Sequence, residues 1–206
     1  MYNGVDVYVR TGEIDWKKVR AAGVRFAMIK ASQGYTLSGD SYLFEDRNFR
    51  KNIVGATNAG LYCGSWHYLT ASCESKAICE AQHYLSIISR YRSRHLLWAA
   101  VDVEEGKYLP STPDKLCAVV DTFCREVAKA NFIPMVYTNP NYIRYKFKRV
   151  PGWDLWLALW RDKTRVPTDY PRMRIWQYGT EAVNGVSMPC DADIGTFWMP
   201  EQDYKA

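Results

Sequence analysis

Two acidic residues, Asp102 and Glu104, stand two positions apart at the end of the apolar run at 99–101. Side chains at positions i and i+2 of a β-strand leave the same face, so both carboxylates would lie together if this run is a strand. Neighbouring carboxylates repel each other, and burial raises the pKa of at least one, so one can hold a proton while the other stays charged. Glycoside hydrolysis requires this combination. A strand end that carries solvated acids is the alternative, and Glu105, on the opposite face, is a poorer candidate.

Short motifs spread over nearly the whole chain favour the enzymatic interpretation. They are Gly4-Val5-Asp6-Val7, Ile14-Asp15-Trp16-Lys17-Lys18-Val19, the stretch from Phe26 to Gly34, Trp66-His67-Tyr68, Asp102-Val103-Glu104, Val136-Tyr137-Thr138, the stretch from Trp156 to Trp160, Trp176-Gln177-Tyr178 and Cys190-Asp191-Ala192-Asp193. In this order, from Gly4 to about Trp198, the set resembles the glycoside hydrolase family 25 lysozymes, the N-acetylmuramidases found among phage endolysins and bacterial wall hydrolases. A single tripeptide carries little information, whereas the ordered set is specific.

The resemblance implies both a fold and a reaction. The fold is α/β, a TIM-like barrel of five βα units followed by three strands, (β/α)5(β)3, with the active face at the C-terminal ends of the strands. The reaction is hydrolysis of the β-1,4 bond between N-acetylmuramic acid and N-acetylglucosamine in bacterial peptidoglycan, without a cofactor. Two alternatives stay open: a non-catalytic barrel that binds cell-wall glycan, and a hydrolase of another β-linked amino-sugar polymer such as chitin.

Four acidic residues match the acids of the family's catalytic groove position by position: Asp6, Asp102, Glu104 and Asp191. Glu104 would be the general acid, because its longer side chain reaches toward the bond and neighbouring negative charge favours its protonated form. Asp102 would stay ionised and either stabilise the oxocarbenium-like state or orient the substrate's 2-acetamido group. Asp6 and Asp191 would hold the sugar or tune the pair. Strand spacing leaves both retention and inversion open.

Aromatic residues at the expected strand ends form a second group of candidates, because sugar rings present apolar faces that stack on Tyr and Trp. The candidates for substrate contact are Tyr35, Tyr68, Tyr137, Trp160 and Tyr178, with His67 as a further candidate for a substrate carboxylate. Aromatic residues make up 15% of the chain, so most of them must be core residues. Trp16, Trp98 and Trp156 are interpreted as packing residues.

Two positions depart from the family's pattern. Gln33 stands where the family usually has Glu, which removes one charge near the expected groove. Cys190-Asp191-Ala192-Asp193 stands where Val-Asp-x-Asn is common, so Asp193 adds a carboxylate. Asp191 is the aligned residue, but either aspartate could do the work.

Apolar strand-like runs alternate with helical patterns, the order that favours a mostly parallel α/β sheet. We expect strands at 5–9, 26–31, 61–68, 97–103 and 132–137, helices at 16–22, 49–59, 74–90 and 112–130, then a short helix at 141–147 and strands at 155–159, 173–178 and near 191. Periodicity by itself indicates only this fold class; the barrel is what the resemblance implies.

The length of 206 residues fits one domain, so we expect residues 1–206 to form a single catalytic domain without wall-binding repeats. No run of about 18 apolar residues exists, and we expect no membrane-spanning segment. The first residues lack the basic and apolar regions of a secretory signal. Either the protein leaves the cytoplasm by another route, such as lysis, or the chain is a mature or trimmed form. We expect synthesis in a host cytoplasm and release by lysis, as for a phage endolysin.

The 27 Lys and Arg against 22 Asp and Glu give a net charge of +5, a mild excess that favours approach to an anionic cell wall. No nucleic-acid motif is present. The resemblance implies peptidoglycan as the partner, and we expect the domain to be monomeric. The six cysteines are dispersed in a chain too large to need disulfides, and we expect reduced thiols. Neither Cys-x-x-Cys nor His-x-x-x-His spacing occurs, so no metal site is expected.

Overall fold

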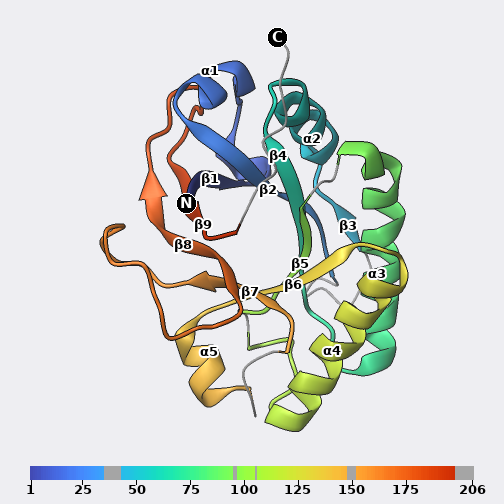
Figure 1. Cartoon of the computed structure of the whole chain (residues 1–206). Helices are drawn as coiled ribbons and strands as arrows, with labels where there is room; N and C mark the ends of the chain where they lie inside the picture. The colour runs from blue at the N-terminus through green and yellow to red at the C-terminus, as the bar shows by residue number, and fades with distance from the viewer. Residues whose placement is uncertain (35–42, 95–96, 105, 148–151, 198–206) are drawn as a thin grey trace.

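A closed ring of eight β-strands forms the centre of the computed structural model, which describes residues 1–34, 43–94, 97–104, 106–147 and 152–197 (Figure 1). The strands of the ring are β1 (Tyr2–Val7), β2 (Val24–Gln33), β4 (Tyr62–Tyr68), β5 (Trp98–Asp102), β6 (Ile133–Thr138), β7 (Asp154–Ala158), β8 (Met173–Glu181) and β9 (Cys190–Gly195). They pair in the order β1-β9-β8-β7-β6-β5-β4-β2, and pairing between β1 and β2 closes the ring. The predicted barrel is confirmed.

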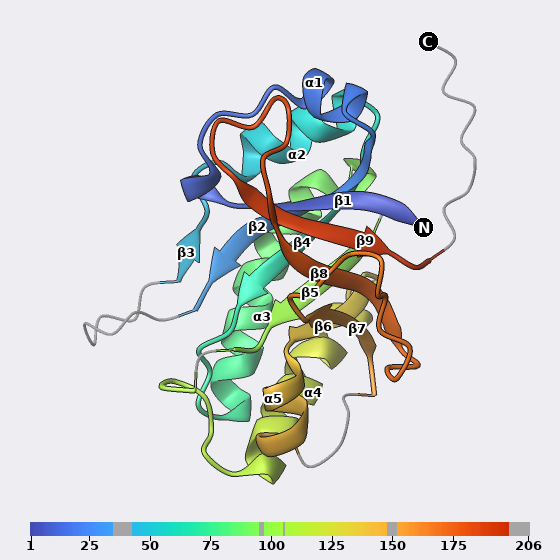
Figure 2. The same ribbon diagram turned by 90° about the vertical axis from the view of Figure 1, so that its left-hand side faces the viewer.

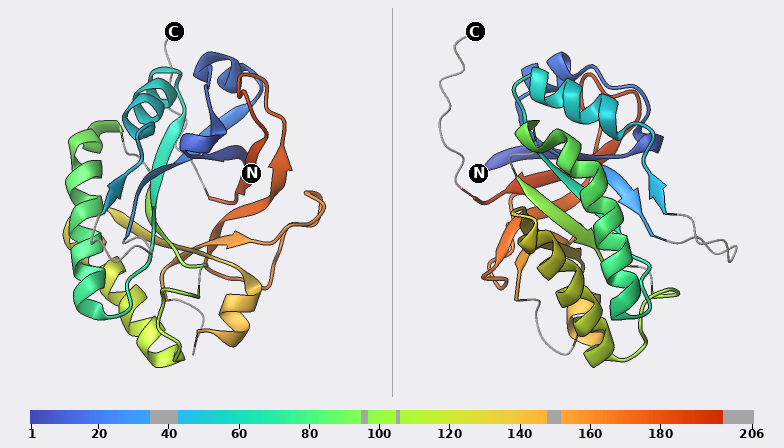
Figure 3. Two further views of the ribbon diagram at one scale, coloured as in Figure 1. Left: turned by 180° about the vertical axis from the view of Figure 1, so that it is seen from behind. Right: turned by 90° about the vertical axis from the view of Figure 1, so that its right-hand side faces the viewer.

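One helix follows each of the first five strands of the ring. These helices are α1 (Trp16–Ala21), α2 (Phe49–Asn58), α3 (Glu74–Ile88), α4 (Pro113–Lys129) and α5 (Pro140–Tyr145), with 3-10 turns η1 (Val9–Thr11) and η2 (Ser89–Arg94). Local signals start them: the Asp15 carboxylate accepts a hydrogen bond from the Lys18 N–H (3.2 Å), and Pro113 opens α4, where its missing N–H leaves no bond unmade. The side of β8 and β9 faces the viewer in Figure 2, and α3 and α4 cover the opposite side in Figure 3 (right).

The last strand of the ring runs against its neighbours. β9 is antiparallel to both β1 and β8, whereas the other neighbouring strands of the ring are parallel. The first residues of β9 therefore lie at the carboxyl-terminal ends of the parallel strands. The sequence did not predict this reversal, nor the two-residue strand β3 (Phe44–Glu45), which pairs antiparallel with the end of β2.

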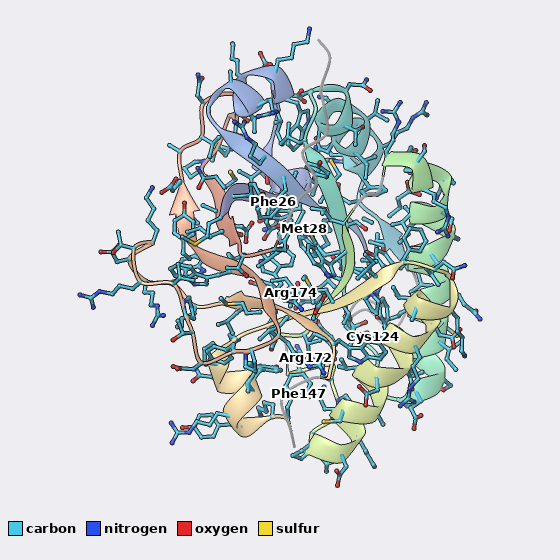
Figure 4. All side chains as sticks on the ribbon, viewed as in Figure 1. Phe26, Met28, Cys124, Phe147, Arg172 and Arg174 are labelled. Carbon is cyan, nitrogen blue, oxygen red and sulfur yellow. The ribbon has the colours of Figure 1, made fainter. Side chains whose placement is uncertain are left out.

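Two apolar layers hold the barrel together. The outer layer lies between strands and helices and includes Val101 of β5 and Phe123 and Cys124 of α4. The inner layer fills the ring, and its members Phe26 and Met28 are labelled in Figure 4 within the circle of strands. Along β2 the inner residues alternate with outer ones, because successive side chains of a strand point to opposite faces.

All six cysteines are free thiols, and three of them, Cys63, Cys124 and Cys190, are buried. Within the ranges that the structure describes, no helix has the length and apolar character needed to cross a bilayer.

Candidate active site

A cavity of about 250 Å³ opens at the carboxyl-terminal ends of the parallel strands. Its lining residues are Asp6, Tyr8, Lys30, Trp66, Tyr68, Asp102, Glu104, Tyr137, Trp156 and Asp191. All four acids predicted from the sequence belong to this lining. The barrel thus gathers carboxylates that are separated by most of the chain.

The ends of the strands determine where each acid lies. Asp102 is the last residue of β5, and Glu104 follows two positions later. Asp6 lies near the end of β1 and is paired directly with Asp191, near the beginning of β9, in the antiparallel register. The reversal of β9 explains how a residue from the start of a strand joins a face made of strand ends.

Asp6 is a buried carboxyl group in a negative environment. Its side chain is 6% exposed, and burial raises the pKa of Asp6 well above its ordinary value. The charges of Asp193, Asp191 and Asp102 raise this pKa further, in that order. A hydrogen bond from the Gln177 amide to Asp6 Oδ2 (2.9 Å) opposes the rise, because it stabilises the ionised form.

The two acids of the β5 motif differ in burial. Asp102 is 4% exposed, and its Oδ1 has no hydrogen-bond partner among the described residues, whereas Glu104 is exposed. Burial raises the pKa of Asp102 well above its ordinary value, the charge of Glu104 adds to the rise, and Lys30 opposes it. We expected Asp102 to stay ionised. Burial in the barrel wall opposes the ionised form, and the counter-charge of Lys30 favours it.

Lys30 brings a cation into this acidic cavity. Its Nζ donates a hydrogen bond to Gln33 Oε1 (3.0 Å) and lies 4.9 Å from the ring centre of Trp66 and 5.2 Å from that of Tyr68. Burial lowers the pKa of Lys30, but the surrounding carboxylates, Asp102 first, favour its charged form. Because Gln33 is neutral, the positive charge of Lys30 acts on the cavity acids without a carboxylate partner at that position.

Gln177 connects the acids to an aromatic wall formed by Tyr137 and Trp160. It is 2% exposed, and its side-chain oxygen accepts hydrogen bonds from Tyr137 OH (3.1 Å) and Trp160 Nε1–H (3.0 Å). Its side-chain nitrogen donates to Asp6 Oδ2 (2.9 Å). One amide therefore joins residues from β1, β6 and the segment after β7.

The structure separates the two aspartates at the start of β9. Asp191 lines the cavity, and burial raises its pKa. Asp193 is 0% exposed; its Oδ1 accepts a hydrogen bond from Trp156 Nε1–H (2.8 Å), and its Oδ2 has no partner among the described residues. Burial raises the pKa of Asp193 well above its ordinary value, which favours the neutral carboxyl group. Only Asp191 is placed to contact a ligand in the cavity.

The aromatic candidates lie in different places. Tyr68 and Tyr137 line the cavity. Trp160 lies beside them, held by Gln177, with 62% of its surface exposed. Tyr178 instead packs on the outer surface of the barrel, with its ring centre 5.6 Å from that of Trp176, and Tyr35 lies outside the described residues.

His67 faces the helices and not the cavity. Its ring is 0% exposed and stacks on Phe123, with ring centres 5.2 Å apart. Both ring nitrogens have partners, Ser32 Oγ at 2.8 Å and Glu80 Oε2 at 2.9 Å. Adjacent residues of β4 point to opposite faces, so Trp66 and Tyr68 reach the cavity while His67 cannot. His67 is therefore not retained as a substrate-contacting residue.

Sequence reasoning missed five residues of the site: Tyr8, Lys30, Trp66, Trp156 and Gln177. Lys30 continues the inward alternation of Phe26 and Met28, a period-two signal that could have identified it. Trp156 was assigned to packing alone; it packs inside the barrel and also lines the cavity.

A second hollow, of about 420 Å³, lies beside the first and shares Lys30 with it. Its other lining residues come from the end of β2, from β3 and from the adjoining turns: Val9, Ser32, Gln33, Phe44, Glu45, Asp46 and Arg47. The shared lysine makes the two hollows neighbours on one face. Among the described residues, no group of three or more His, Cys, Asp and Glu side chains is arranged to hold a metal ion.

The sequence profile of the glycosyl hydrolases family 25 matches residues 5–186 of this chain. Two curated relatives are similar over most of the chain. The autolytic lysozyme of Clostridium acetobutylicum is 29% identical over 192 residues, which cover 92% of this chain and 54% of the relative. Lysozyme M1 of Streptomyces globisporus is 28% identical over 204 residues, which cover 91% of this chain and 65% of the relative. The chain thus spans only between half and two thirds of these relatives.

A solved structure agrees with the fold. The CTP1L endolysin superposes with a TM-score of 0.78 at 25% identity, over 95% of this chain and 67% of that chain. The helices and strands described above therefore follow an architecture that is known from a crystal structure.

Proposed function

The chain belongs to the glycosyl hydrolases family 25, and on this premise we propose that it is a lysozyme. Its reaction is hydrolysis of the β-1,4 bond between N-acetylmuramic acid and N-acetylglucosamine in bacterial peptidoglycan. The observation that carries the proposal is the convergence of Asp6, Asp102, Glu104 and Asp191 on one cavity. Both curated relatives described above are lysozymes, which supports the same substrate.

In this proposal Glu104 donates a proton to the glycosidic oxygen. It is the exposed member of the Asp102–Glu104 pair, so its carboxyl group can reach a polymer that lies across the cavity. The two carboxyl groups can share one proton, and an ionised Asp102 would favour its retention on Glu104 until the bond breaks. Transfer of that proton to the leaving oxygen leaves Glu104 as a carboxylate, which can then accept a proton from the attacking water.

Asp102 supports the positive charge that develops on the sugar ring. As a carboxylate it would stabilise the oxocarbenium-like state directly or accept a hydrogen bond from the 2-acetamido N–H. Lys30 makes this ionised form accessible, because it lowers the pKa of Asp102 against the effect of burial. Asp6 and Asp191 would bind the sugar from the opposite wall, with Tyr68, Tyr137 and Trp160 as stacking surfaces.

The proposed place of action is the bacterial cell wall. The six free thiols suit a protein made in a reducing compartment and released by lysis, as in an endolysin. The similarity to the CTP1L endolysin supports the role of an endolysin, while the similarity to an autolytic lysozyme supports that of a bacterial autolysin. Both roles share the same cleavage reaction.

The test is digestion of purified peptidoglycan by the wild type and by Glu104→Gln. After borohydride reduction, mass spectrometry should find muramitol at the new ends made by the wild type. Loss of the general acid should lower the rate by about 10²- to 10⁴-fold. Glu13→Gln, at an exposed surface position, should keep the wild-type rate and is the matched control.

Other results would replace the proposal. Release of soluble products from chitin oligomers but not from peptidoglycan would indicate a different amino-sugar polymer. Binding of peptidoglycan without cleavage by the wild type would indicate a glycan-binding barrel.

A further inference from the structure

We propose that Gln177 is a positioning residue that ties the aromatic wall of the cavity to the Asp6 carboxylate. The inference rests on the proposed glycosidase function and assigns a role within that same site. Gln177 contributes nothing to the lining of the cavity, yet hydrogen bonds join it to three residues around it: Asp6, Tyr137 and Trp160.

The chemistry of the partners determines which way the amide points. An indole N–H can only donate a hydrogen bond, so the Gln177 atom 3.0 Å from Trp160 Nε1 must be the oxygen. The phenol of Tyr137 donates to that same oxygen at 3.1 Å. With its oxygen occupied by two donors, the amide directs its NH2 group at Asp6 Oδ2, 2.9 Å away.

This orientation restricts Asp6. An amide NH2 group can only donate, so Asp6 Oδ2 must act as an acceptor. Either Asp6 is ionised, or its proton resides on the other oxygen, Oδ1. Gln177 therefore supplies a neutral donor to a carboxyl group that is buried among negative charges, without adding a charge of its own.

The same bonds fix the Trp160 ring. The indole is 62% exposed, and its one polar atom is held by a side chain that is itself 2% exposed. A flat, exposed ring anchored beside the acids is suited to stacking on a sugar. A sugar that presses on Trp160 would act on the amide that holds Asp6, so binding and the state of Asp6 are coupled through Gln177.

Several charged and titratable groups act on Asp6 besides Gln177. From β9, β5, β2 and β6 they are Asp193, Asp191, Cys190, Asp102, Lys30 and Tyr137. A test by pH must therefore change Gln177 while these groups stay in place.

The discriminating variant is Gln177→Glu, which keeps the shape but replaces the NH2 group by an oxygen. At low pH a proton shared between residue 177 and Asp6 can replace the lost N–H donor, and we expect activity within about tenfold of the wild type. Above the pKa of the shared proton the two carboxylates repel each other, and activity should fall about tenfold for each further pH unit. Gln177→Met, which lacks both polar atoms, should lose roughly ten- to hundredfold at every pH, as expected for one lost hydrogen bond to a charged group.

Trp160→Phe provides a second test at an exposed position, where folding is not at risk. It keeps a ring but removes the indole donor, and kcat should fall roughly two- to tenfold. In the Gln177→Met background the same change should have no further effect on kcat, because the link is already broken. Gln82→Glu, on the exposed face of α3, is the charge-matched control and should keep the wild-type pH profile.

The outcomes separate this inference from the proposed function. Equal losses for Gln177→Glu and Gln177→Met at every pH, or additive effects of Trp160→Phe and Gln177→Met, would overturn the role of Gln177. If the wild type does not cleave peptidoglycan, the proposed function fails. The link between Gln177 and Asp6 can still be tested by ¹³C NMR titration of the Asp6 carboxyl group, assigned with Asp6→Asn. A higher pKa of Asp6 in Gln177→Met than in the wild type supports the link, and an unchanged pKa overturns it.

Discussion

Buried carboxyl groups outnumber cations at the mouth of the barrel. Asp6, Asp102 and Asp193 are at most 6% exposed, and Lys30 is the cation that lines the cavity with Asp6 and Asp102. Each of the three acids has a raised pKa for the same first reason, the loss of hydration on burial. The state of the site at a given pH is therefore a property of the group and not of one residue.

The contribution of Asp193 to the pH dependence of stability can be tested, because a neutral amide can replace its carboxyl group. Burial favours a proton on Asp193 in the folded protein, whereas the unfolded chain gives up this proton above an ordinary pKa of about 3.9. Between that value and the higher pKa of the folded state, the folded protein binds more protons than the unfolded chain. The free energy of unfolding therefore falls as pH rises through this window. The loss attributable to this residue is at most about 1.4 kcal/mol per pH unit.

In Asp193→Asn this loss should be absent, since an amide oxygen can still accept the bond from Trp156 Nε1–H. Urea unfolding at intervals from pH 4 to pH 7 measures the difference between variant and wild type, which should grow in favour of the variant as pH rises. Asp169→Asn, at an exposed position, is the control and should show a constant difference. A constant difference for Asp193→Asn as well would mean that Asp193 is ionised in the folded protein.

The acids of the cavity could be predicted from the sequence, whereas their hydrogen-bonding partners could not. The spacing of Asp102 and Glu104 by two positions needs only one strand, so the sequence contains it directly. The contacts of Gln177 join side chains from distant segments, and nothing near residue 177 indicates them. The neighbouring residue Tyr178 was a candidate for substrate contact, but its side chain points to the other face of β8.

At the scale of elements, the end of β4 is fixed to α3 by a buried polar cluster. Glu80, on α3, is 0% exposed and accepts hydrogen bonds from the Thr70 N–H (3.1 Å) and the Thr70 hydroxyl (2.9 Å). Burial lowers the pKa of His67, which favours the neutral ring. That ring can donate from Nε2 to Glu80 and accept at Nδ1 from the Ser32 hydroxyl. The cluster thereby joins β2, β4 and α3 behind the cavity.

Glu80→Gln should disrupt this junction, because three donors converge on the two carboxylate oxygens and an amide offers only one oxygen. Leaving a buried donor without its acceptor costs about 1–3 kcal/mol. Denaturant unfolding measures the loss. Glu13→Gln removes one partner of an exposed ion pair with Lys51 and should change stability by less than about 1 kcal/mol. A loss for Glu80→Gln as small as that of the control would refute the structural role of the cluster.

Helices and strands were predictable where one element carries its own signal. Helix α4 has Pro113 in its first turn and an apolar face with Leu116, Phe123 and Val127 buried, as the periodicity predicts. The direction of β9 was not predictable, because its residues alternate in the same way whether it runs parallel or antiparallel. His67 was misplaced for a related reason: a one-residue shift along a strand moves a side chain to the opposite face.

At the scale of the whole molecule, closure of the barrel brings the first and last strands together. Gly4 of β1 is paired with Phe26 of β2 on one side and with Asp193 of β9 on the other. A Cβ atom at Gly4 would lie 2.1 Å from Cζ of Phe26, so the absence of a side chain there makes room for the ring inside the barrel. A resemblance to a family could predict this closed ring; periodicity could not, since it contains no information on which strands are neighbours.

Gly4→Ala should therefore weaken the whole barrel and not one loop. The methyl group must displace Phe26, which is 0% exposed, and overpacking of this kind costs about 1–3 kcal/mol. In urea the midpoint should fall while the slope of the transition stays the same, because a closed ring unfolds as one unit. Gly152→Ala is the matched control and should leave the midpoint unchanged, because no atom of the described residues, chain neighbours aside, lies within 4 Å of the added Cβ.

Phe26→Leu identifies the cause of the loss. Leucine lacks the ring atoms that the new methyl group would meet, so Gly4→Ala should cost less in the Phe26→Leu background than in the wild type. The two strands that carry these residues also carry Asp6 and Lys30 to the cavity, so cleavage activity should decline at the urea concentration at which the barrel unfolds. Additive costs of the two substitutions would mean that the added methyl group does not act through the Phe26 ring.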